Sequence, residues 1–402
     1  MRIKKIVVLI AALTFFLSCV QEAYSGVGTD TLGEQTGYNI ILISMDTLRY
    51  DHLGSAGYCR NTSPNIDKLL AKEGIVFTQA VSQSNWTLPA NISLLTSQYV
   101  PRHNVDRAFK RLDDAAVTAA EILSAYGYRT AAFTGGFHLS HIFGVDQGFQ
   151  VYYDKEEHSR LDDLLPLVLD WIKNNKAERF FLFLQAYDCH APFDIPVNIE
   201  HMYDPDYQGI MDNFIFDYSL GDLINGNTLT DPLTGEVHHL TEEDIDHIIA
   251  HYDAAINYMD NQIGRFLTEL QKLRLADNTV IVFLGNHGEE LMDHGGRILK
   301  RKHGDAYEEG IRVPLIIKHP GLKRIRGQTI NRQVQLIDVI PTILDFLNIP
   351  VSHSMQGGSL LPLIEGRAPA DFNEYVFTGG YNKQLPIPFS EHMAIRTNEW
   401  KL

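Results

Sequence analysis

The fold is decided by the stretch Tyr38–Met45, which reads YNIILISM and ends at Asp46. Its apolar residues follow one another without polar alternation, which is typical of a strand buried on both faces of a parallel sheet. Similar buried-strand runs occur at Arg129–Thr134, Phe180–Ala186 (FFLFLQA) and Thr279–Leu284 (TVIVFL). Helical periodicity separates these runs, so the sequence predicts an α/β fold with a mainly parallel sheet covered by helices on both faces.

The predicted helices cover Asp113–Tyr126, Leu161–Asn175, Thr241 to about Leu273 and Val334–Leu347, with a strand at Val313–Lys318. A further helix is opened by Ser63 as N-cap and Pro64 as N1, and is closed by Gly74. Residues 194–240 have little periodicity and predict a long insertion of the kind that serves as a lid or binding loop. The chain ends inside an apparent strand, which we interpret as a truncated C-terminal subdomain beginning near residue 351.

The composition is that of an acidic globular protein. Of 402 residues, 45% are hydrophobic and 21% are charged, which provides enough apolar surface for a packed core. Lys and Arg number 34 against 50 Asp and Glu, giving a formal charge of −16. A nucleic-acid-binding protein would show a basic footprint, so that class is excluded. Three cysteines cannot form a disulfide framework.

The first 25 residues predict an export signal, with a basic start followed by the apolar run Ile6–Leu17. Two cleavage sites compete. Ala23-Tyr24-Ser25 is a small-x-small site that would release the protein, whereas Leu17-Ser18 before Cys19 resembles a lipoprotein box and would place a lipid anchor at Cys19. We therefore expect a periplasmic, outer-membrane-anchored or secreted protein, because no later stretch is long and apolar enough to span a membrane.

Polar residues follow two of the buried strands. Asp46 follows the first strand, and Asn286-His287 follows the strand Thr279–Leu284 between two glycines. Open α/β sheets bind ligands at strand carboxyl ends, and a carboxylate, an amide oxygen and an imidazole suit a metal ion. Taken alone, Asp46 is better explained as a turn or cap residue; the shared position at the sheet edge favours a metal site.

A second candidate is Thr87, which precedes Pro89 in a predicted helix with Pro89 at N1 or N2. A helix N-terminus stabilises an attacking oxyanion and an anionic substrate, although spacing alone equally explains Thr87 as a cap. His190, in DCHAP, and His303, in KHG, are further candidates among 17 histidines.

The order of these motifs resembles the sulfatase family of the alkaline phosphatase superfamily. The matching stretches are Asp46–Gly54 (DTLRYDHLG), Thr62–Asp67 (TSPNID), Trp86–Pro89 with Ser93–Thr96, His190–Phe193 (HAPF), Asn286–Glu289 (NHGE) and Tyr307–Leu315 (YEEGIRVPL). The resemblance covers the chain from about Gly37 to its end, with a catalytic domain at 37–350.

The resemblance implies an alkaline-phosphatase-like fold and one divalent cation, calcium first, with magnesium, manganese or zinc as alternatives. Metal ligands would be Asp46, Asn286 and His287, with Thr87 as the nucleophile that also touches the metal. His190 and His303 would bind the anionic group or assist the leaving group, with Lys302 beside His303 binding substrate.

Three positions depart from the family pattern. Thr87 stands where sulfatases carry a Cys or Ser that becomes formylglycine, and the supporting Arg of that motif is absent from Thr87-Leu88-Pro89-Ala90-Asn91. Thr47 replaces a second acidic ligand, and Asn286 replaces the usual Asp. Relatives with an unmodified Thr act mainly on phosphoesters, phosphodiesters or phosphonates, so the resemblance leaves sulfate specificity open.

We therefore expect an exported, metal-dependent hydrolase that cleaves a sulfate, phosphate or phosphonate ester through Thr87. Its substrate would be a small anionic ester or a sulfated or phosphorylated glycan. The alternative is a catalytically impaired relative that binds an anionic glycan or phosphoester. A phosphotransferase is disfavoured because related transferases carry transmembrane helices.

Overall fold

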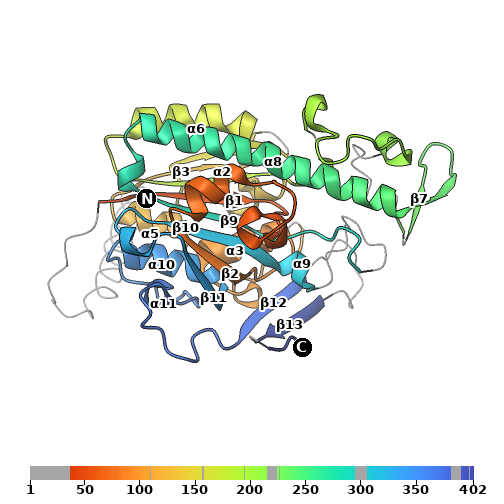
Figure 1. Cartoon of the computed structure of the whole chain (residues 1–402). Coiled ribbons are helices and arrows are strands. Elements are labelled where there is room, and N and C mark those ends of the chain that lie inside the picture. Colours follow the sequence, from red (N-terminus) through yellow and green to blue (C-terminus); the bar gives the residue numbers. More distant parts are fainter. Residues whose placement is uncertain are drawn as a thin grey trace, which may run out of the picture. The chain divides into compact units, whose positions relative to one another are not determined.

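The computed structural model describes residues 37–108, 110–155, 158–193, 195–214, 224–225, 227–294, 306–381, 391–397 and 399–402. Residues 37–402 form one compact unit built on an eight-stranded sheet of order β11-β2-β10-β9-β1-β5-β3-β4 (Figure 1). The strands are β1 (Asn39–Met45), β2 (Ile75–Val81), β3 (Arg129–Phe133), β4 (Val151–Tyr153), β5 (Phe180–Ala186), β9 (Thr279–Gly285), β10 (Arg312–Lys318) and β11 (Gln328–Gln335). Only β10 runs antiparallel to its two neighbours in this sheet, so the mainly parallel prediction is confirmed.

Helices cover both faces of the sheet, as predicted. α6 (Leu161–Asn175) and α8 (Glu242–Lys272) lie on one face, together with the short helices α2 (Pro64–Ile66) and η3 (Asp67–Ala71). α3 (Thr87–Thr96), α5 (Ala119–Ala125), α10 (Val339–Phe346) and α11 (Leu361–Ile364) lie on the other face. Smaller helices are α4 (Val100–His103) and α9 (Glu308–Ile311).

The strands contribute to two hydrophobic cores because successive side chains point to opposite faces of a sheet. Ile41 and Ile43 of β1 pack against the α6 and α8 layer, whereas Ile40 and Leu42 pack against the α3, α5 and α10 layer. This double burial explains why the central strands are continuously apolar in sequence.

Two predicted helices have different boundaries. The helix predicted at Asp113–Tyr126 begins only at Ala119, because Thr118 and Glu121 form a capping box that fixes the helix start. Residues before it form a turn in which Asp113 Oδ1 accepts from the backbone of Ala115 at 2.9 Å. These local hydrogen bonds outweigh the helical pattern.

The prediction of a helix at Val334–Leu347 was wrong about where the helix begins. Val334 belongs to β11 and pairs with Ala80 of β2, and α10 begins at Val339. The capping bond into this turn, from Gln335 N to Asp338 Oδ2 at 2.8 Å, separates the strand from the helix. A continuous apolar run in sequence does not distinguish the end of a buried strand from the start of a buried helix.

The insertion predicted at 194–240 is only partly described, and it contains regular structure. The described parts include the 3-10 helices η6 (Val197–Ile199) and η7 (Ile210–Asn213) and a small sheet of β6 (Ile224–Asn225), β7 (Thr228–Thr230) and β8 (Val237–His239). The chain then enters α8, whose first turn is capped by Thr241. Elsewhere, β12 (Val376–Tyr381) and β13 (Glu391–Arg396) form an antiparallel pair. Across the described residues, every helix is too short or too polar to cross a lipid bilayer.

Candidate functional site

The site lies where neighbouring strands β9, β1, β5 and β3 end. Met45, Gly285 and Ala186 occupy the same level of the sheet, because Met45 pairs with each of the other two. The residues that follow therefore emerge together at one edge. Asp46 donates its backbone N–H to Ala186 O at 3.0 Å, and Asn286 donates to Met45 O at 3.1 Å.

Thr87 reaches this edge from the first turn of α3. The helix begins at Thr87 itself, which places Pro89 at its third position rather than at N1 or N2. Thr87 Oγ1 lies 3.3 Å from Asp46 Oδ2 and 3.2 Å from His287 Nε2. A helix start carries partial positive charge from its unpaired N–H groups. The structure thus brings together Thr87, Asp46 and His287 from segments far apart in sequence.

Asp46 Oδ2 and His287 Nε2 are both positioned to accept the single proton of the Thr87 hydroxyl. His287 Nδ1 lies 2.7 Å from Gly288 O, and a carbonyl oxygen only accepts, so Nδ1 carries the proton. Nε2 therefore presents a lone pair toward Thr87. Burial lowers the pKa of His287 and keeps the imidazole neutral, although Asp46 partly opposes that shift.

Asn286 contacts Asp46 through its amide nitrogen. Its Nδ2 donates to Asp46 Oδ1, while its Oδ1 accepts from the backbone N–H of His287 at 2.7 Å. These two bonds fix which end of the amide faces the carboxylate. The arrangement puts Asn286 at the predicted place but gives it a donor role toward Asp46; its role as a metal ligand stays a prediction.

Glycines and a buried arginine hold the loops of the site. A side chain at Gly288 would collide with the Glu309 backbone, and one at Gly285 would meet Leu48 O at 2.6 Å. Arg49 joins the loop after β1 to the loop after β9, because its Nη1 donates to Glu289 O at 3.2 Å and to Asp293 Oδ2 at 2.7 Å. The predicted second-ligand position, Thr47, turns its Oγ1 to Asp46 O at 2.8 Å.

Asn91 contacts the Thr87 backbone from one turn along α3. Its Nδ2 donates to the backbone oxygen of Thr87 at 2.8 Å, and its Oδ1 accepts from Ser44 Oγ on β1 at 2.9 Å. All three side chains are buried. This pair of bonds fixes the start of α3 against the strand that carries Asp46.

Histidines that sequence analysis did not select also lie at this edge. His138 follows β3 and stacks edge-on with Trp86 at 5.0 Å between ring centroids. Burial lowers its pKa to about 4, while the charge of Asp46 opposes this shift. The same strand-end rule that selected Asp46 could have found His138. His158 lies 5.6 Å from His190 between ring centroids. No predicted strand ends near His158, so its place at this edge could not be predicted from the sequence.

His190 lies after β5, and its Nδ1 donates to Ala191 O at 2.5 Å. Its other ring nitrogen, Nε2, is thereby the acceptor in the neutral ring. The predicted substrate residues Lys302 and His303 lie outside the described residues, as does Cys19 with the export signal at 1–25.

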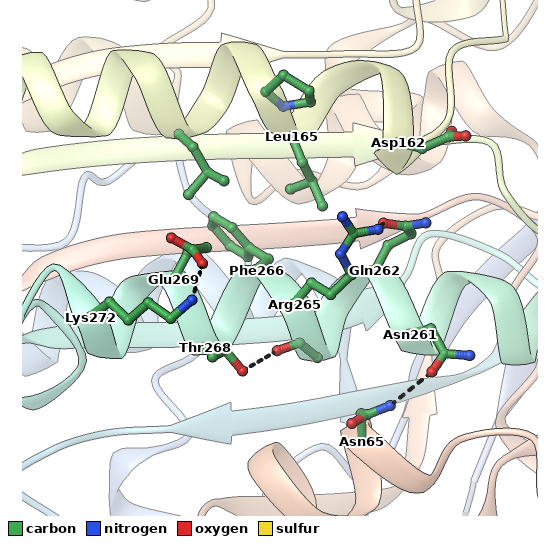
Figure 2. Close-up of a pocket in the computed structure, with 13 residues that line it drawn as sticks. Asn65, Asp162, Leu165, Asn261, Gln262, Arg265, Phe266, Thr268, Glu269 and Lys272 are labelled. Atoms are coloured by element: carbon green, nitrogen blue, oxygen red, sulfur yellow. Dashed lines mark hydrogen bonds and ion pairs between the residues drawn. The ribbon is translucent and has the colours of Figure 1, made fainter.

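A surface cavity elsewhere does not coincide with this site. It lies between α6 and α8, has a volume of about 640 Å³ and is lined by residues such as Asp162, Arg265 and Lys272 (Figure 2). None of the strand-end residues described above lines it.

The geometry fits a divalent cation. Asp46 Oδ1 lies 3.7 Å from His287 Nε2, and Thr87 Oγ1 stands 3.2–3.3 Å from both groups. Donor atoms around a tetrahedral ion with bonds of about 2.0–2.1 Å stand roughly 3.3 Å apart. One carboxylate, one imidazole lone pair and one hydroxyl thus converge at a ligand spacing.

Comparisons with known proteins agree with this fold. The sequence model of the family described as Sulfatase matches residues 38–349, and that of the N-sulphoglucosamine sulphohydrolase C-terminal region matches residues 301–402. The chain is 30% identical over 391 residues to an ulvan-active sulfatase of Formosa agariphila, covering 91% of this chain and 73% of that protein. It is 27% identical to the multifunctional alkaline phosphatase superfamily protein PehA of Trinickia caryophylli, covering 84% of this chain and 79% of PehA.

Solved structures show the same fold. A phosphonate monoester hydrolase of Agrobacterium radiobacter superposes with a TM-score of 0.72 at 21% identity, covering 90% of this chain and 86% of that one. A protein solved with its substrate D-glucosamine-2-N,6-O-disulfate gives a TM-score of 0.74 at 21% identity, covering 91% and 88%.

The family match and the relatives place the chain among the hydrolases of the alkaline phosphatase superfamily. Within that superfamily, the chain belongs to the sulfatase family.

Proposed function

We propose that this protein is an exported, metal-dependent hydrolase that cleaves a sulfate, phosphate or phosphonate ester with Thr87 as the nucleophile. The observation that carries the proposal is the position of Thr87 Oγ1 at a helix start, 3.2 Å from His287 Nε2 and 3.3 Å from Asp46 Oδ2. A nucleophilic hydroxyl needs a proton acceptor and a positive electrostatic environment, and this position offers both.

The proposed reaction has two halves. In the first, the Thr87 hydroxyl proton passes to the Asp46 carboxylate, because the cation would take the Nε2 lone pair of His287. Oγ1 bonds to sulfur or phosphorus as the ester bond breaks. The leaving oxygen receives a proton from Nε2 of His190 in its imidazolium form, and His190 returns to the neutral ring. In the other half, water attacks the same sulfur or phosphorus and gives a proton to His190 Nε2. The Thr87 oxygen leaves with the proton held by Asp46, which releases the inorganic anion or phosphonate and restores the Thr87 hydroxyl.

A divalent cation held by Asp46, His287 and Thr87 would supply Lewis-acid stabilisation of the charge on the transferred group. The family resemblance implies calcium first. Calcium takes 6–8 oxygen ligands, whereas this set includes an imidazole nitrogen, and that donor chemistry favours zinc or manganese instead. The remaining sequence candidates, Lys302 and His303, would bind the anionic group.

The nature of Thr87 bears on the substrate. A threonine ester carries one oxygen on its β-carbon, so it is released only by attack of water at sulfur or phosphorus. We propose an anionic ester, carried on a glycan or on a small molecule, because the relatives named above include an ulvan-active sulfatase and a phosphonate monoester hydrolase. Sulfate, phosphodiester and phosphonate remain alternative substrates that direct assay separates.

An impaired binding protein is the second candidate. The donor contact of Asn286 with Asp46 favours it, because an amide N–H occupies a carboxylate oxygen that an ion would otherwise use. Such a protein would bind the anionic ester and leave it intact.

The test is an assay of wild type, Thr87→Ser and Thr87→Ala against an aryl sulfate, a phosphodiester and a phosphonate monoester, each with added zinc, manganese or calcium. We expect hydrolysis of at least one substrate, retained by Thr87→Ser and reduced about 10³-fold or more in Thr87→Ala. Equal rates in wild type and Thr87→Ala would exclude the proposed nucleophile. Binding without hydrolysis in the wild type would establish the second candidate.

Export is proposed from the leader at 1–25, with a lipid anchor at Cys19 as its anchored form. The support is the basic start and apolar run of the sequence. Fractionation of cells carrying the full chain and its Cys19→Ser variant tests the anchor, because loss of the anchor releases the protein from membranes. Identical soluble fractions for both would instead support cleavage after Ser25.

A further inference from the structure

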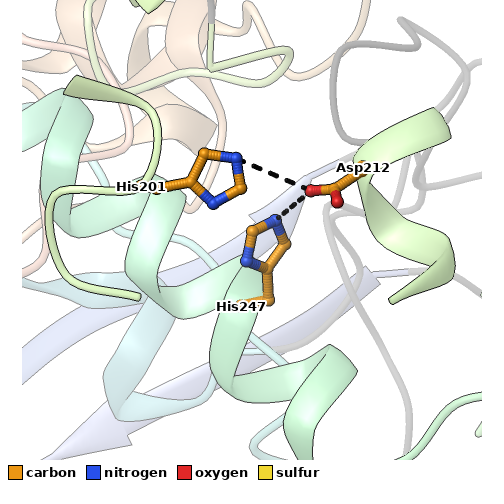
Figure 3. Close-up of side chains that lie close together, drawn as sticks. All are labelled: His201, Asp212 and His247. Carbon is orange, nitrogen blue, oxygen red and sulfur yellow. Dashed lines mark ion pairs between the residues drawn. The ribbon is translucent and has the colours of Figure 1, made fainter. Parts of the chain in front are cut away.

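A second group of metal-ligand side chains lies away from the strand-end site and shares no residue with it. His201, Asp212 and His247 present ligand atoms that all lie within 4.8 Å of one another (Figure 3). His201 and Asp212 belong to the segment 195–214, and His247 lies in the second turn of α8. The group therefore connects the insertion to the longest helix of the fold.

Asp212 is the point toward which both histidines are directed. Its Oδ1 lies 3.3 Å from His247 Nε2 and 3.9 Å from His201 Nε2. The first distance equals the separation of about 3.3 Å expected between two ligands of a tetrahedral zinc ion, and the second exceeds it by a shift that a partly exposed side chain can make. Figure 3 shows the two rings facing the same carboxylate.

Asp204 holds both imidazoles in the orientation that a metal needs. Its backbone oxygen accepts from His201 Nδ1 at 3.3 Å, and its Oδ2 lies 3.1 Å from His247 Nδ1. A carbonyl oxygen only accepts, so His201 carries its proton on Nδ1 and presents a lone pair from Nε2. Metal-bound histidines commonly donate their other N–H to a carboxylate or a backbone carbonyl in this way.

His247 faces two carboxylates with a single proton in its neutral ring. The side chain is fully buried, and its Nε2 makes no hydrogen bond to any described residue although Asp212 Oδ1 is 3.3 Å away. Asp204 Oδ2 accepts the Nδ1 proton, so Nε2 of the neutral ring presents a lone pair toward Asp212 Oδ1. A lone pair and a carboxylate oxygen at this distance repel each other unless a cation lies between them.

We propose that His201, Asp212 and His247 bind a zinc ion that fastens the insertion to α8. Two imidazole nitrogens and one carboxylate oxygen form a donor set that zinc prefers and calcium does not. His251 lies one helical turn beyond His247, with 4.6 Å between ring centroids, and together with water it is a candidate for the fourth position. The stacking of Tyr207 on His247 at 3.7 Å packs the same segment over the site.

The site is tested in a protein from which the strand-end metal is removed by Asp46→Ala. After dialysis against a chelator, this protein is titrated with Zn²⁺ alone, and bound zinc is measured by elemental analysis. We expect one zinc per chain, and a zinc-dependent rise in thermal unfolding temperature, because an ion that binds only the folded state stabilises it. Binding no zinc would overturn the proposal.

Variants of the Asp46→Ala protein locate the ion. His247→Ala and Asp212→Asn should lose the bound zinc and the thermal shift, whereas His239→Ala, at an exposed histidine of the same insertion, should retain both. If His247→Ala fails to fold, His201→Ala decides the question at a partly exposed position and should lower zinc affinity at least tenfold. Unchanged zinc binding in Asp212→Asn and His201→Ala would place the ion elsewhere and contradict the proposal. These readouts do not depend on hydrolysis, so they stand apart from the proposed function.

Discussion

Asn286 and Asp46 determine how the strand-end site balances its charge. The amide N–H of Asn286 donates to the Asp46 carboxylate, and both side chains are buried. An aspartate at this position would instead place two carboxylates side by side, which is unfavourable until a cation lies between them. Asn286 therefore stabilises the buried Asp46 carboxylate by a hydrogen bond but adds no negative charge for binding a cation.

We predict that Asn286→Asp lowers the thermal stability of the metal-free protein and raises its affinity for a divalent cation by roughly tenfold or more. Calorimetric titration and thermal unfolding, each with and without metal, measure the two effects. Asn174→Asp, at an exposed asparagine of α6, serves as a control. Unchanged affinity in Asn286→Asp would remove Asn286 from the metal site.

Much of the candidate site could be predicted at the residue level because strand ends share one edge of a parallel sheet. Asp46, His287 and Thr87 meet as the sequence indicates. The direction of the Asn286 amide could not be predicted. It depends on the hydrogen bond that the His287 backbone N–H donates to Asn286 Oδ1, which the sequence does not specify. His138 was accessible to the same rule but was not selected, and His158 reaches the cluster only through tertiary packing.

At the scale of elements, α3 is held in place partly by a buried neutral histidine. His103, at the end of α4, has Nε2 2.9 Å from Ser93 Oγ of α3, and its Nδ1 accepts from the Val105 backbone at 3.1 Å. Burial lowers its pKa from 6.5 to about 3, with Asp106 partly opposing the shift. Protonation of Nδ1 would also remove the acceptor that Val105 needs.

This histidine makes stability fall with acid. Below pH 6.5 the unfolded chain binds a proton at His103 that the folded chain does not bind. The free energy of unfolding therefore increases as the pH rises from about 3 to 6.5, and decreases as the pH falls through the same range. The slope is about 1.4 kcal/mol per pH unit for one such group.

We predict that His103→Gln is less stable than wild type at pH 7 by about 1–3 kcal/mol, because one buried hydrogen bond is lost or weakened. Its free energy of unfolding should fall less between pH 6.5 and pH 4 than that of the wild type. Denaturant unfolding at several pH values measures both effects, with His239→Gln at an exposed site as the control. Parallel pH curves for His103→Gln and wild type would contradict the prediction.

Elements with strong local signals were predicted well. β5 and α6 have the predicted boundaries, and α8 begins one residue inside its predicted start. β2 was not predicted because its register partners, β10 and β11, lie more than 200 residues away in sequence. The start of α2 was predicted, but the residue that caps it was not. Ser63 stands at the predicted N-cap position, whereas Asp260 of α8 accepts from the first backbone N–H groups. The two distances are 2.9 Å to Asn65 N and 2.7 Å to Ile66 N.

At the scale of the whole molecule, the proposed hydrolytic site and the proposed zinc site lie in different regions. The proposed ester-cleaving groups lie at the carboxyl edge of the central sheet, and the proposed zinc ion lies where the insertion meets α8. The division at residue 351 into a catalytic domain and the start of a C-terminal subdomain remains a proposal. Within the described part of the chain, β12 is attached to the loop before α3, since Thr378 Oγ1 donates to Ser82 O at 2.7 Å.

The central claim is that an unmodified Thr87 attacks the ester, and a covalent intermediate tests it most directly. The metal-loaded protein is mixed with the best substrate from the panel, quenched in acid during turnover, digested and analysed by mass spectrometry of the peptide that contains Trp86–Leu95. We predict an unmodified threonine in the resting enzyme and a sulfo or phospho group on Thr87 during turnover, with no adduct in Thr87→Ala. Turnover that continues at the wild-type rate in Thr87→Ala, with no adduct on this peptide in either protein, would contradict the account.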